Sequence, residues 1–390
     1  MRRGLLAFAG AALLLGTAYA GSAGQSVSAS ATAPFPIVAT VQPSTGPLSG
    51  GQSVIVSGQN FQTGATVGFG NWATVPGQWI DSSHLRVTTP SFPNEGVISI
   101  TVTNPDGQSA SAQNGYAYLH GIYTLDGFGG MHPDGGSAPV SGGAFWPGWK
   151  IARAAVLTSD NSGGLVLDGY GGLHPFGSMT IQPAAAYFGW DIARDVALLP
   201  ASSIFEAQGY TLDGWGGVHA FGGAPPPHGF AYWPGWSIAK KIRLLPDGTG
   251  GYVLDGYGGL HGFAVGSNPM PPLITTYAYW GGSDIARDFA IAYNSSAATG
   301  IGGVTLDGLG GVHAFGNVNS VTLFPPYIGS SVRDTFRALT LAPQAPLADL
   351  AGWTMDGYGG IYPFGRWVPP VRPLGGSWPN WDIAVSLLVQ

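Results

Sequence analysis

Short runs in which apolar and polar residues alternate, divided by turns rich in glycine and proline, extend along most of the chain. In the run 192–198, for example, Arg194 and Val196 share one face while Ala193 and Ala197 share the other. Alternation with a period of two is typical of a β-strand that is buried on one side. We therefore expect an all-β fold.

The first part of the chain has such runs at the spacing of a two-sheet sandwich. Turn signals divide them, among them Gly50-Gly51, whose backbone angles a β-carbon would forbid, and the Asn-Pro-Asp-Gly stretch at 104–107. Short strands at this spacing predict an immunoglobulin-like β-sandwich over residues 36–120. The expected strands are 53–57, 65–69, 85–89 and 97–103.

Beyond residue 120 the phrase Leu-Asp-Gly-x-Gly-Gly and one close variant occur six times, at intervals of 42, 45, 42, 52 and 49 residues. Self-similarity at this period indicates a repeat architecture, and its length is that of a propeller blade. The aspartates of the six copies, called the turn aspartates below, are Asp126, Asp168, Asp213, Asp255, Asp307 and Asp356.

A second phrase, Ile-Ala-Arg and its variants, precedes an alternating run and also occurs six times. Within a repeat, a run such as 251–254, a glycine-rich turn and a run such as 260–263 together predict a hairpin. The second phrase begins at Ile151, Ile192, Ile238, Ile285, Thr335 and Ile383.

The phase of the repeats indicates how the array ends. The first copy begins with a hairpin, and the chain finishes with the second phrase and no hairpin after it. The run 383–389 is therefore expected to pair with 123–126, which closes a ring and removes an exposed strand edge. We predict a six-bladed β-propeller over residues 121–390. An open solenoid is the alternative, but it needs distinct polar caps, and the sequence shows none.

Composition narrows the function classes. Hydrophobic residues make up 45% of the chain, enough to form cores despite 65 glycines and 31 prolines. The net charge is −6, and it becomes −8 if Arg2 and Arg3 are removed with a signal peptide, which disfavours a nucleic-acid partner. Without cysteine the chain has no disulfide, thiolate metal site or lipid-modified cysteine.

The N-terminus has the pattern of an export signal. Arg2 and Arg3 precede an apolar stretch over 5–15, and Ala18-Tyr19-Ala20 forms a small-x-small cleavage site. The alternative is a membrane anchor, but the apolar stretch is shorter than the roughly 20 residues that a spanning helix needs. We expect a signal peptide at 1–20, a flexible linker at 21–35, and a secreted or cell-surface protein with no membrane span after cleavage.

The predicted sandwich also resembles a known family. Segments 43–47, 58–61, 67–70 and 102–107, together with Gly50-Gly51, are similar to the IPT/TIG family of immunoglobulin-like domains. The resemblance implies a spacer or interaction module. Because relatives occur in surface receptors, polysaccharide-acting enzymes and DNA-binding factors, it implies architecture more firmly than function.

The repeat resembles, more loosely, the Gly-Tyr-Trp-Leu-Val-Ala-Ser-Asp-Gly-Gly-Val-Phe-Ala-Phe-Gly repeats of exported actinobacterial proteins. Residues 251–256 and 219–222 carry the likeness. The resemblance implies a propeller at or beyond the cell wall, and it supplies no ligand.

One histidine recurs at a single position of five repeats, with Tyr362 in the sixth. A zinc site needs three or four convergent ligands, and a ring spreads equivalent residues apart. We therefore expect no metal and no cofactor, and interpret the position as a polar-tipped aromatic that packs beside a phenylalanine two residues later in four repeats. The histidines are His132, His174, His219, His261 and His313.

The turn aspartates and the basic residue of the second phrase are both expected to be structural. Six equivalent carboxylates argue against catalysis, which needs groups in differing environments. The basic residue lies in phase with large apolar side chains, so we expect it to enter a blade interface and pair with a turn aspartate. These residues, called the repeat cations below, are Arg153, Arg194, Arg287 and Arg337, with Lys240 equivalent.

Tryptophans near the second phrase are the candidate ligand-binding residues. Exposed indoles repeated around a propeller would suit sugar binding, whereas the alternative is that the rings wedge adjacent blades. The candidates are Trp149, Trp190, Trp236, Trp280 and Trp381.

Taken together, the sequence favours an exported, non-enzymatic binding or scaffold protein with an unidentified extracellular protein or glycan ligand. The alternatives are a lectin-like propeller and an extracellular enzyme acting on polysaccharide. An enzyme would need one pocket with non-repeated charged groups, and Glu206, Lys241 and Arg366 show no visible constellation.

Overall fold

The computed structural model describes residues 33–137, 139–318, 333–343, 345, 347–348, 350–365 and 376–390. These residues form strands and turns and no helix, so the prediction of an all-β fold is confirmed. Residues 1–35 separate as one unit from 36–390. The predicted signal peptide, most of the predicted linker and Arg366 lie outside the described residues. Within the described ranges no helix has the length and apolarity that crossing a membrane requires.

Residues 37–119 form two sheets packed face to face. One sheet has the strand order β1-β3-β7-β6 and the other β2-β9-β8-β4-β5, in which β2 and β9 run parallel. The bounds are β1 (Ile37–Gln42), β3 (Ser53–Gln59), β7 (His84–Thr88), β6 (Gln78–Asp81), β2 (Thr45–Pro47), β9 (Ser109–Leu119), β8 (Gly96–Thr103), β4 (Thr66–Phe69) and β5 (Ala73–Pro76).

Alternation along these strands places one apolar set in a single core. Val54 and Val56 of β3 and Leu85 of β7 are buried against Phe69 of β4 and Tyr116 of β9. Because the intervening side chains point outward, each strand contributes every second residue to the space between the sheets.

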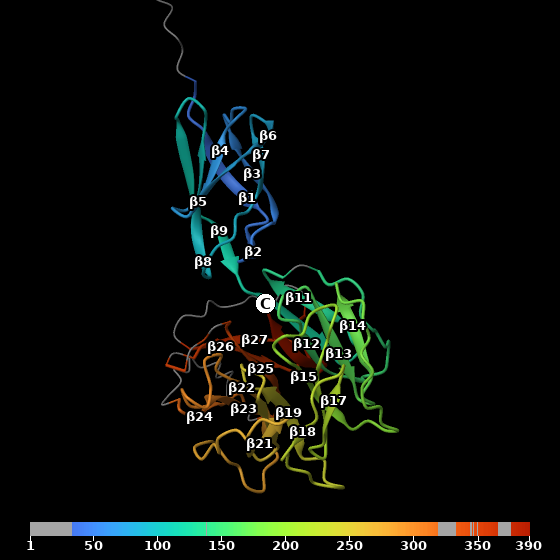
Figure 1. Ribbon diagram of the computed structural model, residues 1–390. Coiled ribbons are helices and arrows are strands. Elements are labelled where there is room, and N and C mark those ends of the chain that lie inside the picture. The colour runs from blue at the N-terminus through green and yellow to red at the C-terminus, as the bar shows by residue number, and fades with distance from the viewer. Residues whose placement is uncertain are drawn as a thin grey trace, which may run out of the picture. The chain divides into compact units, whose positions relative to one another are not determined.

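Residues 121–389 form six sheets built on one three-stranded pattern, numbered here 1 to 6 by the order of their middle strands (Figure 1). Each has an inner, a middle and an outer strand, and the middle strands are buried along their length. In that order the strands are β28 (Ala384–Val389), β10 (Gly121–Asp126) and β11 (Met131–Gly135); β12 (Ala152–Leu157), β13 (Gly163–Asp168) and β14 (Leu173–Gly177); β15 (Ala193–Leu198), β16 (Gly209–Asp213) and β17 (Val218–Phe221); β19 (Ala239–Leu244), β20 (Gly250–Asp255) and β21 (Leu260–Val265); β22 (Ala286–Ile291), β23 (Gly302–Asp307) and β24 (Val312–Gly316); β25 (Phe336–Leu341), β26 (Gly352–Asp356) and β27 (Ile361–Phe364). Sheet 4 also has a short fourth strand, β18 (Pro227–His228), beside β21.

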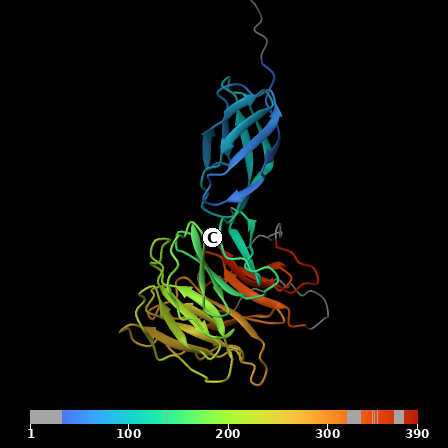
Figure 2. The ribbon, with the colours of Figure 1, turned by 90° about the vertical axis from the view of Figure 1, so that its right-hand side faces the viewer.

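The inner strands form a closed circle. Each contacts the inner strand of the next sheet, from β12 through β15, β19, β22 and β25 to β28, and β28 contacts β12. The C-terminal strand β28 pairs antiparallel with β10, with Tyr123 opposite Leu388 and Leu125 opposite Ser386. The first and last segments of this region therefore complete one sheet, as the turned view also shows (Figure 2).

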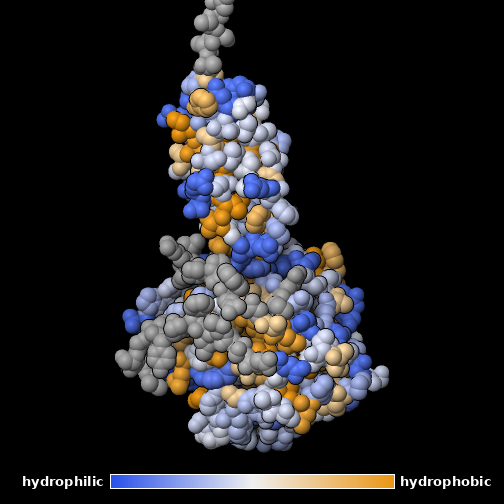
Figure 3. Space-filling model, turned by 90° about the vertical axis from the view of Figure 1, so that its left-hand side faces the viewer, coloured by the Kyte–Doolittle hydropathy of each residue, from blue (hydrophilic) through white to orange (hydrophobic). Residues whose placement is uncertain are grey.

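Apolar side chains fill the spaces between neighbouring sheets. Ile242 of β19 and Phe263 of β21 in sheet 4, for example, are buried against Tyr210 and Leu212 of β16 in sheet 3. Figure 3 shows both apolar and polar patches on one face of the molecule.

Every inner strand contains a β-bulge at the same place. In β15 the register with β16 shifts between Ala193 and Asp195, so Arg194 is the extra residue, and equivalent shifts occur in the other five sheets. A bulge interrupts the two-residue alternation and redirects the extra side chain. The strand therefore does not continue the simple alternation that the sequence pattern predicts for residues 192–198.

Candidate functional site

Each turn aspartate organises the hairpin that follows its middle strand. In sheet 3, Oδ1 of Asp213 accepts hydrogen bonds from the backbone N–H groups of Trp215 at 2.8 Å and Gly217 at 2.9 Å. Oδ2 lies 2.8 Å from Nε2 of His219. All six turns repeat this arrangement, with Tyr362 O–H donating to Asp356 at 2.8 Å in sheet 6. The geometry is that of a structural turn.

The electrostatics of these turns follow from their hydrogen bonds. Burial would raise the pKa of Asp168 and Asp307, but bonds from His174 and His313 and from backbone N–H groups outweigh it and lower both pKa values. In sheet 6, burial and the neighbouring carboxylate raise the pKa of Tyr362, which keeps its hydroxyl a donor.

The recurring histidines pack against a second set of rings, called the wedge rings. In sheet 2 the ring of His174 lies edge-on to Trp146, with 4.9 Å between centroids. Trp146 also covers Gly129 in the turn of sheet 1, where φ is +92° and a β-carbon would lie 2.9 Å from the indole. One ring thus fills the space between two successive turns. The wedge rings are Trp146, Phe188, Trp233, Trp280, Phe336 and Trp378.

The expected pairing of repeat cations with turn aspartates is wrong. Arg153 instead binds Asp191, the residue that precedes the second phrase of the next sheet, through both Nε and Nη2. Lys240 likewise binds Asp284 at 2.8 Å. The bulge turns each cation out of the strand alternation and toward the next sheet, while histidine and backbone groups occupy the turn aspartate. Equivalent links are Arg194 to Ser237, Arg287 to Asp334 and Arg337 to Asp382.

Four of the five candidate tryptophans are exposed. Trp149, Trp190, Trp236 and Trp381, called the rim tryptophans, are 52%, 53%, 48% and 55% accessible. Trp280 is partly buried and is a wedge ring, so it does not belong to the exposed set. The sequence distinguishes the two sets of rings by their distance from the second phrase. Trp280 lies five residues before Ile285, as the wedge ring Trp146 does before Ile151.

Each rim tryptophan contacts the aromatic residue in the turn of the same sheet. The centroids of these paired rings lie 5.4 to 5.9 Å apart. In sheets 2, 3 and 4 an exposed tyrosine adds a third ring next to the turn residue. The pairs are Trp381 with Phe128, Trp149 with Tyr170, Trp190 with Trp215 and Trp236 with Tyr257, and the third rings are Tyr187, Tyr232 and Tyr279.

These ring clusters, called the aromatic rim, occupy four consecutive sheets, 1 to 4. In sheet 5 both members of the pair are replaced, the tryptophan by Ser283 and the turn ring by Leu309. Polar residues directly follow the indoles, among them Lys150, Asp191 and Asp382. The rim therefore offers flat apolar faces beside hydrogen-bonding groups.

A non-repeated group of charges, called the central cluster, lies on the inner strands of sheets 3 to 5. Nη1 of Arg243 donates to Asp195 at 2.6 Å, and Nη2 donates to Asp288 at 2.6 Å. Lys241 Nζ lies 3.6 Å from Asp195. Lys241, for which the sequence shows no visible constellation, thus belongs to a charged group in the structure.

Both carboxylates of the central cluster are also bound to the next sheet. Asp195 accepts from the backbone N–H of Ile242, and Asp288 accepts from that of Leu339, each at 2.9 Å. Burial would lower the pKa of Arg243, but Asp288 and Asp195 outweigh it and raise that pKa, which keeps the guanidinium charged.

Among the described residues, Glu206 belongs to no charged cluster. Glu206 accepts a hydrogen bond from Gln208 on an exposed loop. Across the described ranges, no three histidine or acidic side chains gather where they would hold a metal ion.

In the sandwich, the glycine and asparagine signals have definite roles. Gly50 and Gly51 have φ of +69° and +80°, and a β-carbon on Gly50 would lie 2.4 Å from the backbone of Pro90. Asn104 joins two loops, because its Nδ2 donates to Asn60 O at 2.9 Å and its Oδ1 accepts from Gln62 N at 3.1 Å.

Residues 36–118 match the IPT/TIG domain. The IPT/TIG match covers the sandwich. No curated protein matches the chain in sequence.

Solved structures with some likeness extend over both the IPT/TIG domain and the six sheets. A protein of unknown function from Bacteroides thetaiotaomicron is 13% identical with a TM-score of 0.38, covering 90% of this chain and 92% of its own. An auxiliary nutrient binding protein from Bacteroides ovatus is 12% identical with a TM-score of 0.33, covering 82% and 95%. Another auxiliary nutrient binding protein, from Bacteroides thetaiotaomicron, is 10% identical with a TM-score of 0.32, covering 82% and 95%.

Proposed function

We propose that this chain is an exported, non-enzymatic binding protein in which an IPT/TIG domain accompanies a six-bladed β-propeller. The closed circle of inner strands and the shared three-stranded pattern support the propeller. The observation that carries the binding role is the aromatic rim, whose four indoles remain half-exposed although their wedge-ring neighbours are packed between sheets. Single exposed hydrophobic residues are common on protein surfaces, but the repetition of exposed indoles at equivalent places of four sheets favours a binding surface.

Export is supported by sequence. The basic start, the apolar stretch and the small-x-small site precede residue 21, and the repeat resembles those of exported proteins. N-terminal sequencing of the secreted chain should give Gly21 as the first residue. Retention of Arg2 and Arg3 in the mature protein would contradict export by this route.

Carbohydrate is the ligand class that the rim suits best. A sugar ring has an apolar face that packs on an indole and hydroxyl groups that bond to adjacent polar side chains. Four similar clusters on consecutive blades suit a polymer of repeating units, because linked contacts raise the overall affinity without any single strong site. A polysaccharide outside the cell is therefore our proposed ligand.

Catalysis is not part of the proposal. Two carboxylates are the minimum for most glycoside hydrolysis, and Asp195 and Asp288 supply two. Both are occupied by Arg243 and by backbone N–H groups, which leaves neither poised as a base or nucleophile.

A glycan array tests the binding role. The wild-type chain should bind a polysaccharide class, and a variant with all four rim tryptophans changed to alanine should lose that signal. Each single change should lower affinity about fivefold, because ring stacking contributes on the order of 1 kcal/mol beyond area burial.

The matched control is Phe205→Ala, which removes an exposed ring of the same region that is 78% accessible and outside the rim. It should leave glycan binding unchanged. An array without signal for the wild type, or equal losses in the control, would refute the proposal.

A further inference from the structure

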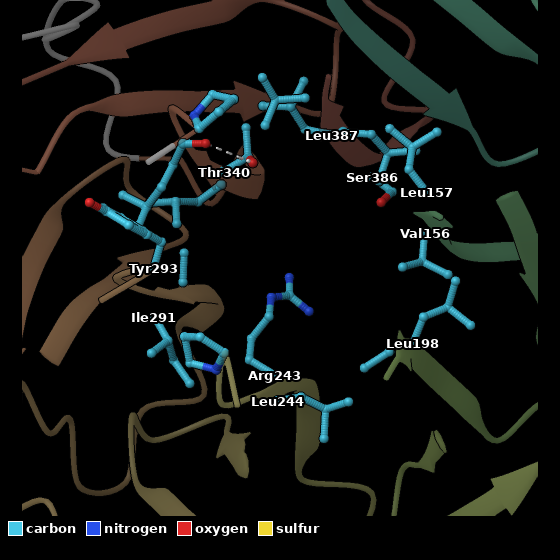
Figure 4. A pocket seen from close by; sticks show the side chains of 18 of the residues that line it. Val156, Leu157, Leu198, Arg243, Leu244, Ile291, Tyr293, Thr340, Ser386 and Leu387 are labelled. Atoms are coloured by element: carbon cyan, nitrogen blue, oxygen red, sulfur yellow. Dashed lines mark hydrogen bonds between the residues drawn. The ribbon is translucent and has the colours of Figure 1, made fainter. Parts of the chain in front are cut away.

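A cavity of about 490 Å³ lies at the centre of the circle of inner strands (Figure 4). Its lining comes from the later residues of those strands and the loops that follow them. The rim tryptophans precede the same strands, so the cavity and the aromatic rim lie toward opposite ends of them. The volume falls in the range of about 300 to 1,000 Å³ that is usual for small-molecule sites.

The throat of the cavity is apolar. It is formed by the last residue of every inner strand, and these side chains are only partly buried. Displacing water from an apolar surface of this kind lowers the free energy and therefore favours ligand binding. The throat residues are Leu157, Leu198, Leu244, Ile291, Leu341 and Val389.

Arg243 places a polar group inside this apolar lining. Figure 4 shows its side chain directed into the open centre, and 27% of the side chain is accessible. A guanidinium has five N–H groups. Bonds to Asp195, Asp288 and the carbonyl of Ile242 use three of them. Its Nε–H and one Nη2–H have no hydrogen-bond acceptor within the part of the chain that the structure describes, although the guanidinium lies 5.7 Å from the centroid of the Phe289 ring.

The fold itself does not require these charges. At the position of Arg243, the other inner strands carry small, apolar or hydroxyl side chains, and the blades form equally well there. Buried ion networks seldom stabilise a protein more than apolar residues of similar volume. The equivalents of Arg243 are Val156, Ala197, Ala290, Thr340 and Leu388.

We propose that the cavity is a second ligand site, separate from the aromatic rim, for a neutral amphipathic small molecule. Its apolar part fills the throat, and a carbonyl or hydroxyl oxygen accepts hydrogen bonds from the open N–H groups of Arg243. Neutrality follows from charge balance, because Asp195 and Asp288 offset Arg243 and Lys241 and leave no spare charge for an ionic ligand. A cationic ligand is disfavoured as well, because its charge would lie next to the N–H donors of Arg243.

A series with one chain and three head groups tests this chemistry. Octanamide, octanoate and octylamine are titrated into the full-length protein and followed by ligand-observed NMR. The expected order of affinity is octanamide, then octanoate, then octylamine. Octylamine binding as well as octanamide, or no binding by any of the three, would overturn the proposal.

Two cavity variants and two controls locate the site. Thr340→Trp adds a bulky side chain to the cavity lining, at the position equivalent to Arg243, and should abolish octanamide binding. Ser283→Trp adds the same side chain at an exposed position outside the cavity and should not. Arg243→Lys keeps the positive charge between the carboxylates but removes the open N–H groups, and should weaken octanamide binding about tenfold. The quadruple rim variant should keep octanamide binding, which separates this site from the proposed glycan site. Undiminished binding in both Thr340→Trp and Arg243→Lys would refute it.

Discussion

Replacing a turn aspartate tests whether these residues act through hydrogen bonds to their own turn. Asp213 is 4% accessible, and its carboxylate serves two backbone N–H groups and His219. Asp213→Ala leaves these donors without an acceptor. Asp213→Asn keeps one oxygen for both backbone groups, and its amide donates to Nε2 of His219 once the ring carries its proton on Nδ1.

The two substitutions should therefore differ widely. Each buried donor left without a partner costs about 1 to 3 kcal/mol. With two backbone groups and one ring nitrogen, and some relief by water, Asp213→Ala should lower the free energy of unfolding by about 3 to 5 kcal/mol. Asp213→Asn loses the charge but keeps the bonds, so it should cost about 1 kcal/mol.

Urea unfolding followed by tryptophan fluorescence measures both values. Eleven of the 13 tryptophans lie beyond residue 120, so the transition of the six sheets dominates the signal. Asp247→Ala, in an exposed turn, is the control and should cost no more than about 1 kcal/mol. Equal costs for the alanine and asparagine variants at Asp213 would refute the reasoning.

Three further predictions concern the same region. The folded-state pKa values of Asp168 and Asp307 lie below the ordinary 3.8, so both carboxylates stabilise the fold above that pH, and this contribution is lost as the pH falls through the folded values. Acid unfolding of the wild type should therefore begin near or below pH 3.8. In the variant with both aspartates changed to asparagine it should move to higher pH. Arg337→Ala removes a partly exposed ion pair with Asp382 and should cost less than about 1 kcal/mol in urea unfolding, a difference that high salt should shrink; a larger, salt-independent cost would contradict this. Deleting residues 384–390 removes β28 and its buried Leu387 and exposes the edge of β10. The free energy of unfolding, obtained from thermal unfolding, should therefore fall by at least about 5 kcal/mol. An unchanged unfolding midpoint would mean that pairing of β28 with β10 is dispensable.

Much of the architecture follows from periodicity. The alternating runs of the sandwich correspond to β3, β4, β7 and β8, and the phase of the repeat explains why the C-terminal strand pairs with β10. These features depend on local patterns and on the need to bury every strand edge, both of which are visible in a single sequence.

Periodicity does not predict which residues the repeat cations bind. A β-bulge adds one residue without changing the pattern of apolar residues in the sequence. The sequence therefore predicts that Arg153 pairs with the turn aspartate Asp168, whereas in the structure it binds Asp191 of the next sheet. Alignment of the six inner strands would have flagged Asp195, Lys241, Arg243 and Asp288 as departures from the repeat. Their convergence depends on how sheets 3 to 5 pack, which periodicity does not encode.

The distinction between wedge rings and rim tryptophans is central to the proposed function, and indole NMR tests it directly. Nitrogen-15 labelling gives one N–H signal per tryptophan, and single phenylalanine substitutions assign them. On addition of the polysaccharide fragment that binds best on the array, the signals of Trp149, Trp190, Trp236 and Trp381 should shift. Those of Trp146, Trp233, Trp280 and Trp378 should shift less. Larger shifts of the wedge signals, or shifts confined to Trp72 and Trp79 of the IPT/TIG domain, would contradict a binding surface on the aromatic rim.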